Sequence, residues 1–309
     1  METLLVTHSA CLDHEVPPGH PENPDRLRAV LGALEAEEFA LLMRVEAPRA
    51  TVEQLERVHP PIHIETILNS VPETGFHRVD ADTAMSPGSG EAALRAAGAV
   101  VHAVDEVMAG RARNAFCAIR PPGHHAEPDQ AMGFCLFNNV AIGALHARDA
   151  HGLARIAVID FDVHHGNGTQ ACFETDPNLF YASTHQWPLY PGTGRAGERG
   201  LGNILNACLA PGAGSAEFRE VFAEVILPAL TQFAPDFIFI SAGFDAHHAD
   251  PLANLRLSED DYGWATTELV QLANKLCNGR VVSTLEGGYD LAALAASTRS
   301  HVRALQFAA

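Results

Sequence analysis

The sequence predicts an α/β fold in which a mainly parallel central sheet carries helices on both faces. Short apolar runs rich in β-branched residues alternate with longer helical stretches, and this alternation is typical of parallel sheets. No Pro/Ser/Gly-rich linker, block of like charge or internal repeat divides the 309 residues. We therefore expect one domain spanning 1–309, a length that a single α/β domain can reach.

The expected strands are six short apolar segments, each followed by polar or glycine-rich sequence. They are Thr3–Thr7, Ala115–Ile119, Arg155–Phe161, Leu179–Ser183, Asp236–Ser241 and Arg280–Leu285. Three helices are expected. The first is Glu91–Ala109, which a glycine ends, and the second is Glu217–Phe233, which Pro228 interrupts. The third begins at Ser258 and has acidic residues in its first turn. Since open parallel sheets place their sites at the carboxyl ends of strands, the polar segments there are candidates for function.

The composition excludes several classes of protein. Acidic residues outnumber basic ones 38 to 20, which gives a net charge of −18 and argues against binding to nucleic acid, whose phosphates attract Lys and Arg. No apolar run is long enough for a membrane helix and the opening residues lack the features of a signal peptide, so we expect a cytoplasmic protein without a membrane anchor. The 6 cysteines form no C-x-x-C pair, which favours reduced thiols over disulfides or a cysteine metal cluster.

The segment that follows the strand Arg155–Phe161 carries the strongest signal for a metal site. Period-2 alternation turns Asp160, Asp162 and His164 to one side of the chain. Carboxylates and an imidazole that converge at a strand end suit Zn²⁺ or Fe²⁺. A hydrogen-bonded polar loop is the alternative, but burial of these charged groups without a cation would be costly.

A third ligand could come from Asp245, which follows the apolar strand Asp236–Ser241 and a glycine. Its alternative role is that of a turn or helix-capping residue. His247 and His248 are rival ligands, but they lie beyond the turn and are better explained as surface or loop-packing histidines.

His124 and His125 stand side by side after a strand, on a loop that begins with two prolines. Adjacent imidazoles point in different directions, so the pair suits acid–base chemistry better than chelation of one metal. Asp160 and Asn167 are available to fix their tautomers. The alternative is a pair of polar loop histidines without a catalytic role.

Tyr289 follows a double glycine at the end of the strand Arg280–Leu285. The glycines allow a tight turn that would expose the hydroxyl, a neutral donor able to stabilise an oxyanion. A tyrosine in this position can also be present only for packing.

Together these segments resemble the histone deacetylase superfamily, which includes bacterial deacetylase-like amidohydrolases, acetylpolyamine amidohydrolases and acetoin-utilisation proteins. The resemblance extends from His20 to Tyr289 and within the superfamily is nearest to the class II branch. The motifs that carry it are Arg120–Ala126, Gly133–Asn139, Asp160–Gln170, Ser241–Asp245 and Leu285–Tyr289.

The resemblance implies an arginase-like α/β fold with one catalytic zinc bound by Asp162, His164 and Asp245, where Fe²⁺ could take the same ligands. Related arginases hold two metals with Asp-x-His-x-Asp segments, whereas this chain has Asp-x-Asp-x-His, so a single catalytic metal is expected. The resemblance also implies a structural K⁺ near Asp160, Asp162, His164 and Ser183, bound mostly by backbone carbonyls.

The same resemblance assigns the acid–base groups. Asp160 becomes the partner of His124 rather than a zinc ligand. His125 becomes the general base and later the acid, with Asn167 as its outer partner, and Tyr289 becomes the donor to the oxyanion.

The resemblance further implies a narrow channel for an acylated side chain. Gly133 and Phe134 are expected on one wall, Tyr190 or Trp187 on the other, and Leu252 at the rim. The expected substrate is an acyl-lysine in a protein or peptide, and the alternatives are an acetylated polyamine or, remotely, an inactive scaffold that binds acylated partners.

Leu252 favours a peptide substrate, because the polyamine-selective class II relative carries at the corresponding position a glutamate that could pair with the distant amine of a polyamine. Glu22 or Asp82 could supply the missing charge instead. The sequence carries no signal for oligomeric state.

Overall fold

A sheet of eight parallel strands runs through the middle of the protein, whose computed structural model describes residues 2–308. Its spatial order is β2-β1-β5-β10-β9-β6-β7-β8, and all neighbours are parallel. The strands are β1 (Thr3–Thr7), β2 (Met43–Glu46), β5 (Asn114–Cys117), β6 (Ile156–Asp160), β7 (Leu179–Gln186), β8 (Ile204–Leu209), β9 (Phe237–Ala242) and β10 (Val281–Leu285). A small antiparallel hairpin is made by β3 (His77–Arg78) and β4 (Ala84–Met85).

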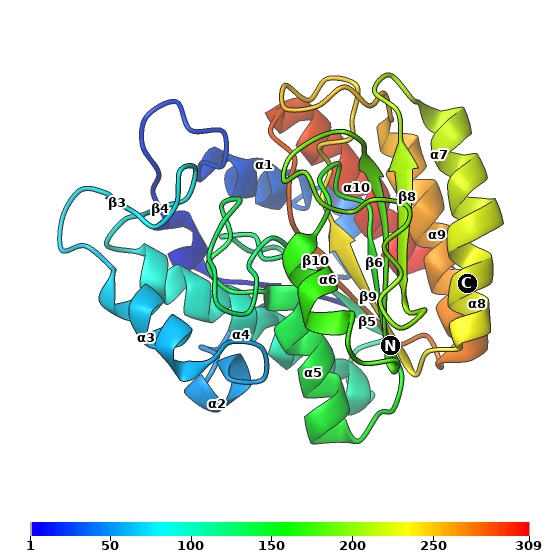
Figure 1. The fold of residues 1–309 in the computed structure, drawn as a ribbon, viewed down its shortest axis with the longest axis horizontal. Coiled ribbons are helices and arrows are strands. Elements are labelled where there is room, and N and C mark those ends of the chain that lie inside the picture. The colour runs from blue at the N-terminus through cyan, green and yellow to red at the C-terminus, as the bar shows by residue number, and fades with distance from the viewer. Residues whose placement is uncertain (1, 309) are drawn as a thin grey trace.

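Helices cover both faces of this sheet. They are α1 (Asp25–Ala33), α2 (Val52–Leu55), α3 (Pro61–Asn69), α4 (Ser89–Met108), α5 (Asn139–His151), α6 (Asn167–Phe173), α7 (Ser215–Val221), α8 (Leu227–Phe233), α9 (Glu259–Leu276) and α10 (Leu291–Phe307). Figure 1 shows α4 and α5 on one side of the sheet and α7, α8, α9 and α10 on the other. The predicted α/β architecture is therefore confirmed.

All six expected strands are present, with ends that differ by a few residues. The two edge strands, β2 and β8, were not expected, because polar residues interrupt their apolar sequence. The expected helix Glu217–Phe233 is helical throughout, and a π-helical turn, Phe222–Ile226, lies between its α-helical parts α7 and α8. Pro228 lies in the first turn of α8, where its missing N–H is tolerated.

The central strands are apolar on both sides because helices cover both. Every residue of β6, β9 and β10 is buried, so these strands lack the alternation of a half-exposed sheet. They are also neighbours in the sheet, which brings the segments after them to one edge. The polar groups that follow these strands are thus held at one edge of the buried centre of the sheet.

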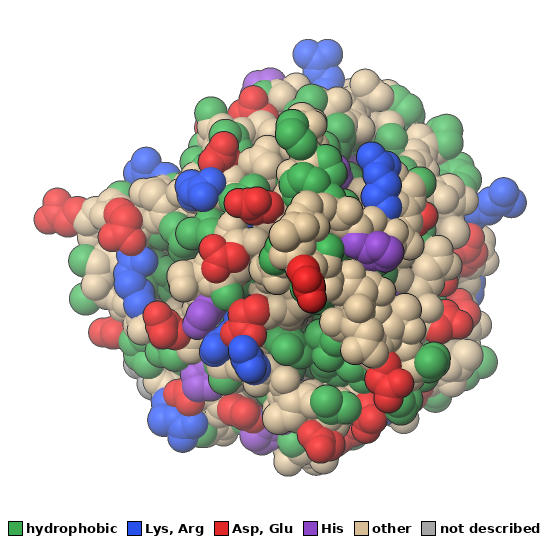
Figure 2. Space-filling model, turned by 90° about the vertical axis from the view of Figure 1, so that its left-hand side faces the viewer, with side chains coloured by type: hydrophobic (Ala, Val, Ile, Leu, Met, Phe, Trp, Pro, Cys, Tyr) green, Lys and Arg blue, Asp and Glu red, His purple; other side chains and the backbone are tan. Residues whose placement is uncertain are grey.

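The surface reflects the acidic composition. Figure 2 shows Asp and Glu side chains spread over one face, with fewer Lys and Arg among them. Within residues 2–308, no helix is both long and apolar enough to cross a membrane.

Candidate active site

The ends of β6, β9 and β10 meet because these strands are paired in register. Asp160 is opposite Ser241, and Leu285 is opposite Ala242. The residues just beyond them therefore lie at one point, as expected for the carboxyl edge of a parallel sheet.

Two glycines allow the groups at this edge to approach one another. A Cβ on Gly243 would clash with the carboxylate of Asp162. A Cβ on Gly287 would clash with the carboxylates of both Asp162 and Asp245. Glycine is required at both positions because the space is filled by the acidic side chains themselves.

Asp162, His164 and Asp245 form a buried group whose ligand atoms all lie within 4.8 Å of one another. His164 Nδ1 lies 3.1 Å from Asp162 Oδ1 and 3.1 Å from Asp245 Oδ2. The other oxygens are held by backbone: Asp162 Oδ2 accepts the Gly287 N–H at 2.8 Å, and Asp245 Oδ1 accepts the Val163 N–H at 2.9 Å. Asp162 Oδ1 also accepts the His164 N–H at 2.9 Å, so backbone donors fix both carboxylates while each keeps an oxygen toward the imidazole, as suits a metal centre.

Electrostatics favour a cation in this group. Burial, followed by the neighbouring Asp162 carboxylate, raises the pKa of Asp245 to about 7. Burial alone would lower the pKa of His164, but its hydrogen bonds to Asp162 and Asp245 raise it to about 10. Two buried carboxylates need a positive charge between them, which a proton or a metal ion can supply.

The first of the tandem histidines is paired with a carboxylate. His124 Nδ1 lies 3.0 Å from Asp160 Oδ2, which also accepts the Tyr181 hydroxyl at 3.0 Å. Burial alone would lower the pKa of His124, but Asp162 and Asp160 raise it to about 10. The two carboxylates therefore favour the protonated form of His124.

The second histidine has a neutral partner. His125 Nδ1 lies 2.8 Å from Asn167 Oδ1. Burial and then the charges of His124 and His164 hold the pKa of His125 well below its ordinary value. His125 is therefore neutral, with its proton on Nδ1 toward Asn167 and Nε2 free to accept another.

Two buried or partly buried glutamates at this site were not assigned from the sequence. Glu127 Oε1 accepts the Asn167 Nδ2–H at 2.7 Å and so fixes which end of the amide faces His125. Glu286 accepts the backbone N–H groups of Gly123 and His124 at 2.7 and 3.1 Å, which anchors the histidine loop. A carboxylate between an apolar strand and a double glycine was the available signal for Glu286.

Tyr289 is fixed through both its backbone and its ring. Its N–H donates to Asp250 Oδ2 at 2.7 Å, and the Arg26 guanidinium lies over the ring at 4.8 Å from its centroid. Burial raises the pKa of Tyr289 well above its ordinary value, despite the opposing charge of Arg26. The hydroxyl therefore stays protonated and can donate a hydrogen bond.

A cavity of about 200 Å³ reaches this centre from the surface. Gly133, Phe134, Tyr190 and Leu252 line it. The same cavity contacts three groups of the centre, His125, His164 and Tyr289. A Cβ on Gly133 would clash with the His125 ring, so glycine is required beside the base.

Trp187 does not line this channel, which corrects one of the two alternatives for its second wall. Its N–H donates to the carbonyl of Leu209 at 2.8 Å, and its ring faces the Arg195 guanidinium at 5.9 Å. Trp187 thus continues the pairing of β7 with β8, while Tyr190 reaches the channel. The other wall also includes Leu189.

Glu22 is likewise unavailable at the rim, because it is fully buried and pairs with Arg26 and Arg120. Asp82 does line the channel. Of the two acids, Asp82 is therefore the one that can place a negative charge at the rim.

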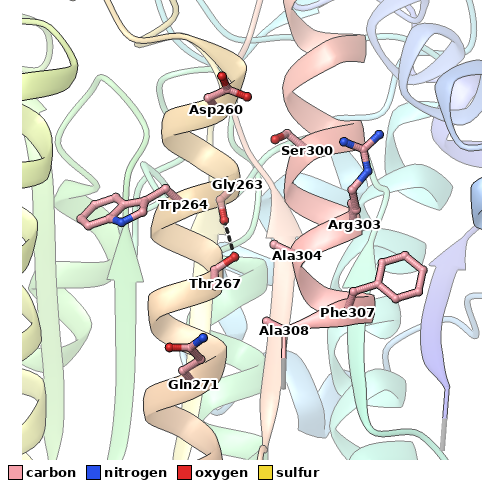
Figure 3. A pocket seen from close by; sticks show the side chains of 10 residues that line it. All are labelled: Asp260, Gly263, Trp264, Thr267, Gln271, Ser300, Arg303, Ala304, Phe307 and Ala308. Carbon is pink, nitrogen blue, oxygen red and sulfur yellow. Dashed lines mark hydrogen bonds between the residues drawn. The ribbon is translucent and has the colours of Figure 1, made fainter.

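A second hollow, of about 520 Å³, lies between α9 and α10 (Figure 3). It is larger than the channel and shares no lining residue with it. Its charged side chains, Asp260 and Arg303, lie apart from each other in Figure 3. None of the residues that line it belongs to a group of candidate metal ligands. Size alone does not mark the active site of this protein.

Comparison with known proteins agrees with the geometry at the strand ends. The sequence profile of the histone deacetylase domain matches residues 20–305. The chain belongs to the histone deacetylase family. A solved structure, the HD domain of HDA15, superimposes with a TM-score of 0.93 at 35% identity, covering 100% of this chain and 90% of that one. This likeness confirms the deacetylase-like fold that the sequence predicts.

Relatives of this histone deacetylase family member come from several kingdoms. Histone deacetylase 14, chloroplastic, of Arabidopsis thaliana is 41% identical over 98% of this chain and 76% of its own length. The histone deacetylase-like amidohydrolase of Pseudomonas aeruginosa is 40% identical over 88% of this chain and 73% of its own. These names support hydrolysis of an amide as the activity of the chain.

Proposed function

We propose that the protein is a zinc-dependent deacylase that removes acetyl or other acyl groups from lysine side chains in proteins or peptides. The observation that supports this most directly is the meeting of a buried Asp-His-Asp group, a neutral histidine and a tyrosine hydroxyl at one channel. We further propose that residues 1–309 act as one catalytic domain.

Asp162, His164 and Asp245 would hold the metal. Their three converging donor atoms fit Zn²⁺, and also Fe²⁺, and His164 lines the channel. When bound, such an ion polarises the acyl carbonyl and lowers the pKa of a water molecule. A structural K⁺ near Asp160 and Ser183 is a second proposal, supported by the burial of both side chains.

His125 would move the protons of the reaction. Its free Nε2 accepts a proton from the attacking water, while its Nδ1–H keeps donating a hydrogen bond to Asn167 Oδ1. His125 then returns that proton to the leaving amine, which frees lysine and the carboxylate. His124, already protonated beside Asp160, holds its charge next to the reacting centre.

Tyr289 would stabilise the charge that develops on the acyl oxygen. Its protonated hydroxyl is a donor in a site partly closed to water, where such a hydrogen bond is strongest. Phe134, whose ring lies 6.0 Å from that of Tyr289, would confine the apolar part of the acylated side chain.

Replacement of Asn167 by Asp should move the acidic limb of the kcat/KM profile to higher pH, by about one unit. The new carboxylate favours the imidazolium form of His125, so the base is lost at a higher pH than in the unmodified protein. The profile should be measured on an acetyl-lysine peptide.

The neighbour Glu127 determines the size of this shift. In the Asn167→Asp variant two carboxylates would share a proton, which weakens the new charge. The double variant Asn167→Asp, Glu127→Gln removes that competition and should shift the limb further. An unchanged limb in the double variant would show that His125 is not the base.

The proposed substrate class rests on the apolar rim at Leu252. A carboxylate at this position could pair with the distant amine of a polyamine, whereas leucine offers apolar contact only. The test is hydrolysis of acetyl-lysine peptides, longer acyl-lysine peptides and acetylated polyamines, measured side by side. We expect the peptides to have the higher kcat/KM.

An acetylpolyamine is the second candidate, favoured by the Asp82 carboxylate that lines the channel. Leu252→Glu should raise kcat/KM for acetylated spermidine relative to the peptide, because it adds a second carboxylate to the rim. If the unmodified protein already prefers the polyamine by tenfold, about 1.4 kcal/mol in transition-state binding, the choice of lysine peptides is wrong.

A further inference from the structure

A second group of metal-ligating side chains lies on two helices outside the active site. It consists of Asp105 on α4 and of His146 and His151 on α5. The Nε2 atoms of both imidazoles lie 2.7 Å from the same oxygen, Oδ1 of Asp105. The two rings are 5.5 Å apart between centroids and meet at 82°, so they approach the carboxylate from two directions.

The fold keeps this group apart from the active site. The first residue of α5, Asn139, donates from Nδ2 to the carbonyl of Pro121 on the tandem-histidine loop. His151 is the last residue of the same helix, which Gly152 ends with a φ of 67°. A helix of 13 residues is about 20 Å long, so the second group lies at the far end of α5. Figure 1 shows α4 and α5 packed side by side along this length.

Asp105 has no permanent cation as a partner. Within residues 2–308, no Lys or Arg nitrogen lies within 4.0 Å of its carboxylate, and the nearby Arg111 pairs with Glu106 at 2.7 Å instead. Burial would raise the pKa of Asp105, but the hydrogen bonds from His146 and His151 keep it below its ordinary value. The group therefore offers an ionised oxygen and two imidazole nitrogens at one point.

We propose that Asp105, His146 and His151 bind a divalent transition-metal ion such as Zn²⁺, which joins α4 to α5. Two imidazoles and a carboxylate are donors that such ions prefer, and water completes the coordination. The side chains of His146, His151 and Asp105 are 7%, 25% and 41% exposed, so one ligand is anchored in the interior and the ion enters from the Asp105 side.

The site is tested by equilibrium dialysis of the tag-free protein against ZnCl₂, after its active site has been loaded with zinc. We expect uptake of about one further equivalent per chain, which Asp105→Asn and His151→Ala should both abolish. His102→Ala, on the same helix α4, is the matched control and should keep it. The proposal is overturned if the unmodified protein takes up no further zinc, or if both variants bind as much as the control.

A second measurement separates a bound ion from simple hydrogen bonds between the helices. In proteins whose active site is already loaded with zinc, further Zn²⁺ should raise the Tm of the unmodified protein and of His102→Ala but not that of His151→Ala, because an ion that binds only the folded chain stabilises it. Equal Tm gains in all three proteins would contradict the site. Amide hydrolysis should be the same in His151→Ala, so the outcome is independent of the proposed activity.

Discussion

Replacement of His164 or Asp245 by alanine is expected to abolish both tightly bound metal and amide hydrolysis. Each supplies one of three donor atoms in a buried group, and removal of either leaves two ligands, too few to hold the ion tightly. Because the metal would polarise the acyl carbonyl, loss of a ligand should lower the rate of the chemical step as well as the affinity for the substrate. We expect activity to fall by at least about 10³-fold, the scale on which a catalytic centre is lost.

Metal content by mass spectrometry and activity on an acetyl-lysine peptide should be measured on the same samples. Asp105→Asn is used as the background, so that an ion on α4 and α5 is not counted. His248→Ala is the matched control, since this rival histidine is exposed and lies three residues from Asp245. Full metal content with normal activity in His164→Ala would refute the assignment.

A variant that fails to fold would also lose metal, so a milder change is needed. Asp245→Asn keeps an oxygen that can accept the Val163 N–H, which now holds Asp245 Oδ1 at 2.9 Å. This variant should unfold as cooperatively as the parent, but it should bind the metal far more weakly. The pair of variants separates loss of a ligand from loss of structure.

The sequence predicts the parts of this site that are local. Asp162 and His164 share a face because alternation in an extended segment is a two-residue property, and the buried β6 before them is continuous and apolar. Asp245 is predictable as a candidate because it follows a similar strand. That the two strands are neighbours is a property of topology, which no local pattern specifies.

Long-range partners could not be predicted in the same way. Glu127 reaches Asn167 across 40 residues, and Glu286 reaches Gly123 across 163. Trp187 and Tyr190 were equal candidates for one wall because both are aromatic and lie in the same loop. The structure separates them through the backbone pairing of Trp187 with β8. Residues that act through a distant neighbour require the packed fold.

Tyr289→Phe is expected to lower kcat by about 10²–10³-fold with little change in KM, the size of effect found when one donor to an oxyanion is lost. The ring would keep its contact with Arg26 and its place near Phe134, so the site should retain its shape. The loss falls on kcat because the hydroxyl binds the charged oxygen of the transition state more strongly than the neutral carbonyl of the substrate.

Tyr190→Phe is the matched control for this change, since Tyr190 lines the same channel and its ring lies 5.2 Å from that of His125 between centroids, a contact that phenylalanine would keep. It should leave kcat within about threefold of the parent, as expected for a residue that contributes no donor to the transition state. If Tyr289→Phe is as active as Tyr190→Phe, the oxyanion must be held without Tyr289. The hydrogen bond from the Tyr289 N–H to Asp250 would then serve only to shape the turn, and Gly287 would be required only for the clearance of Asp162 and Asp245.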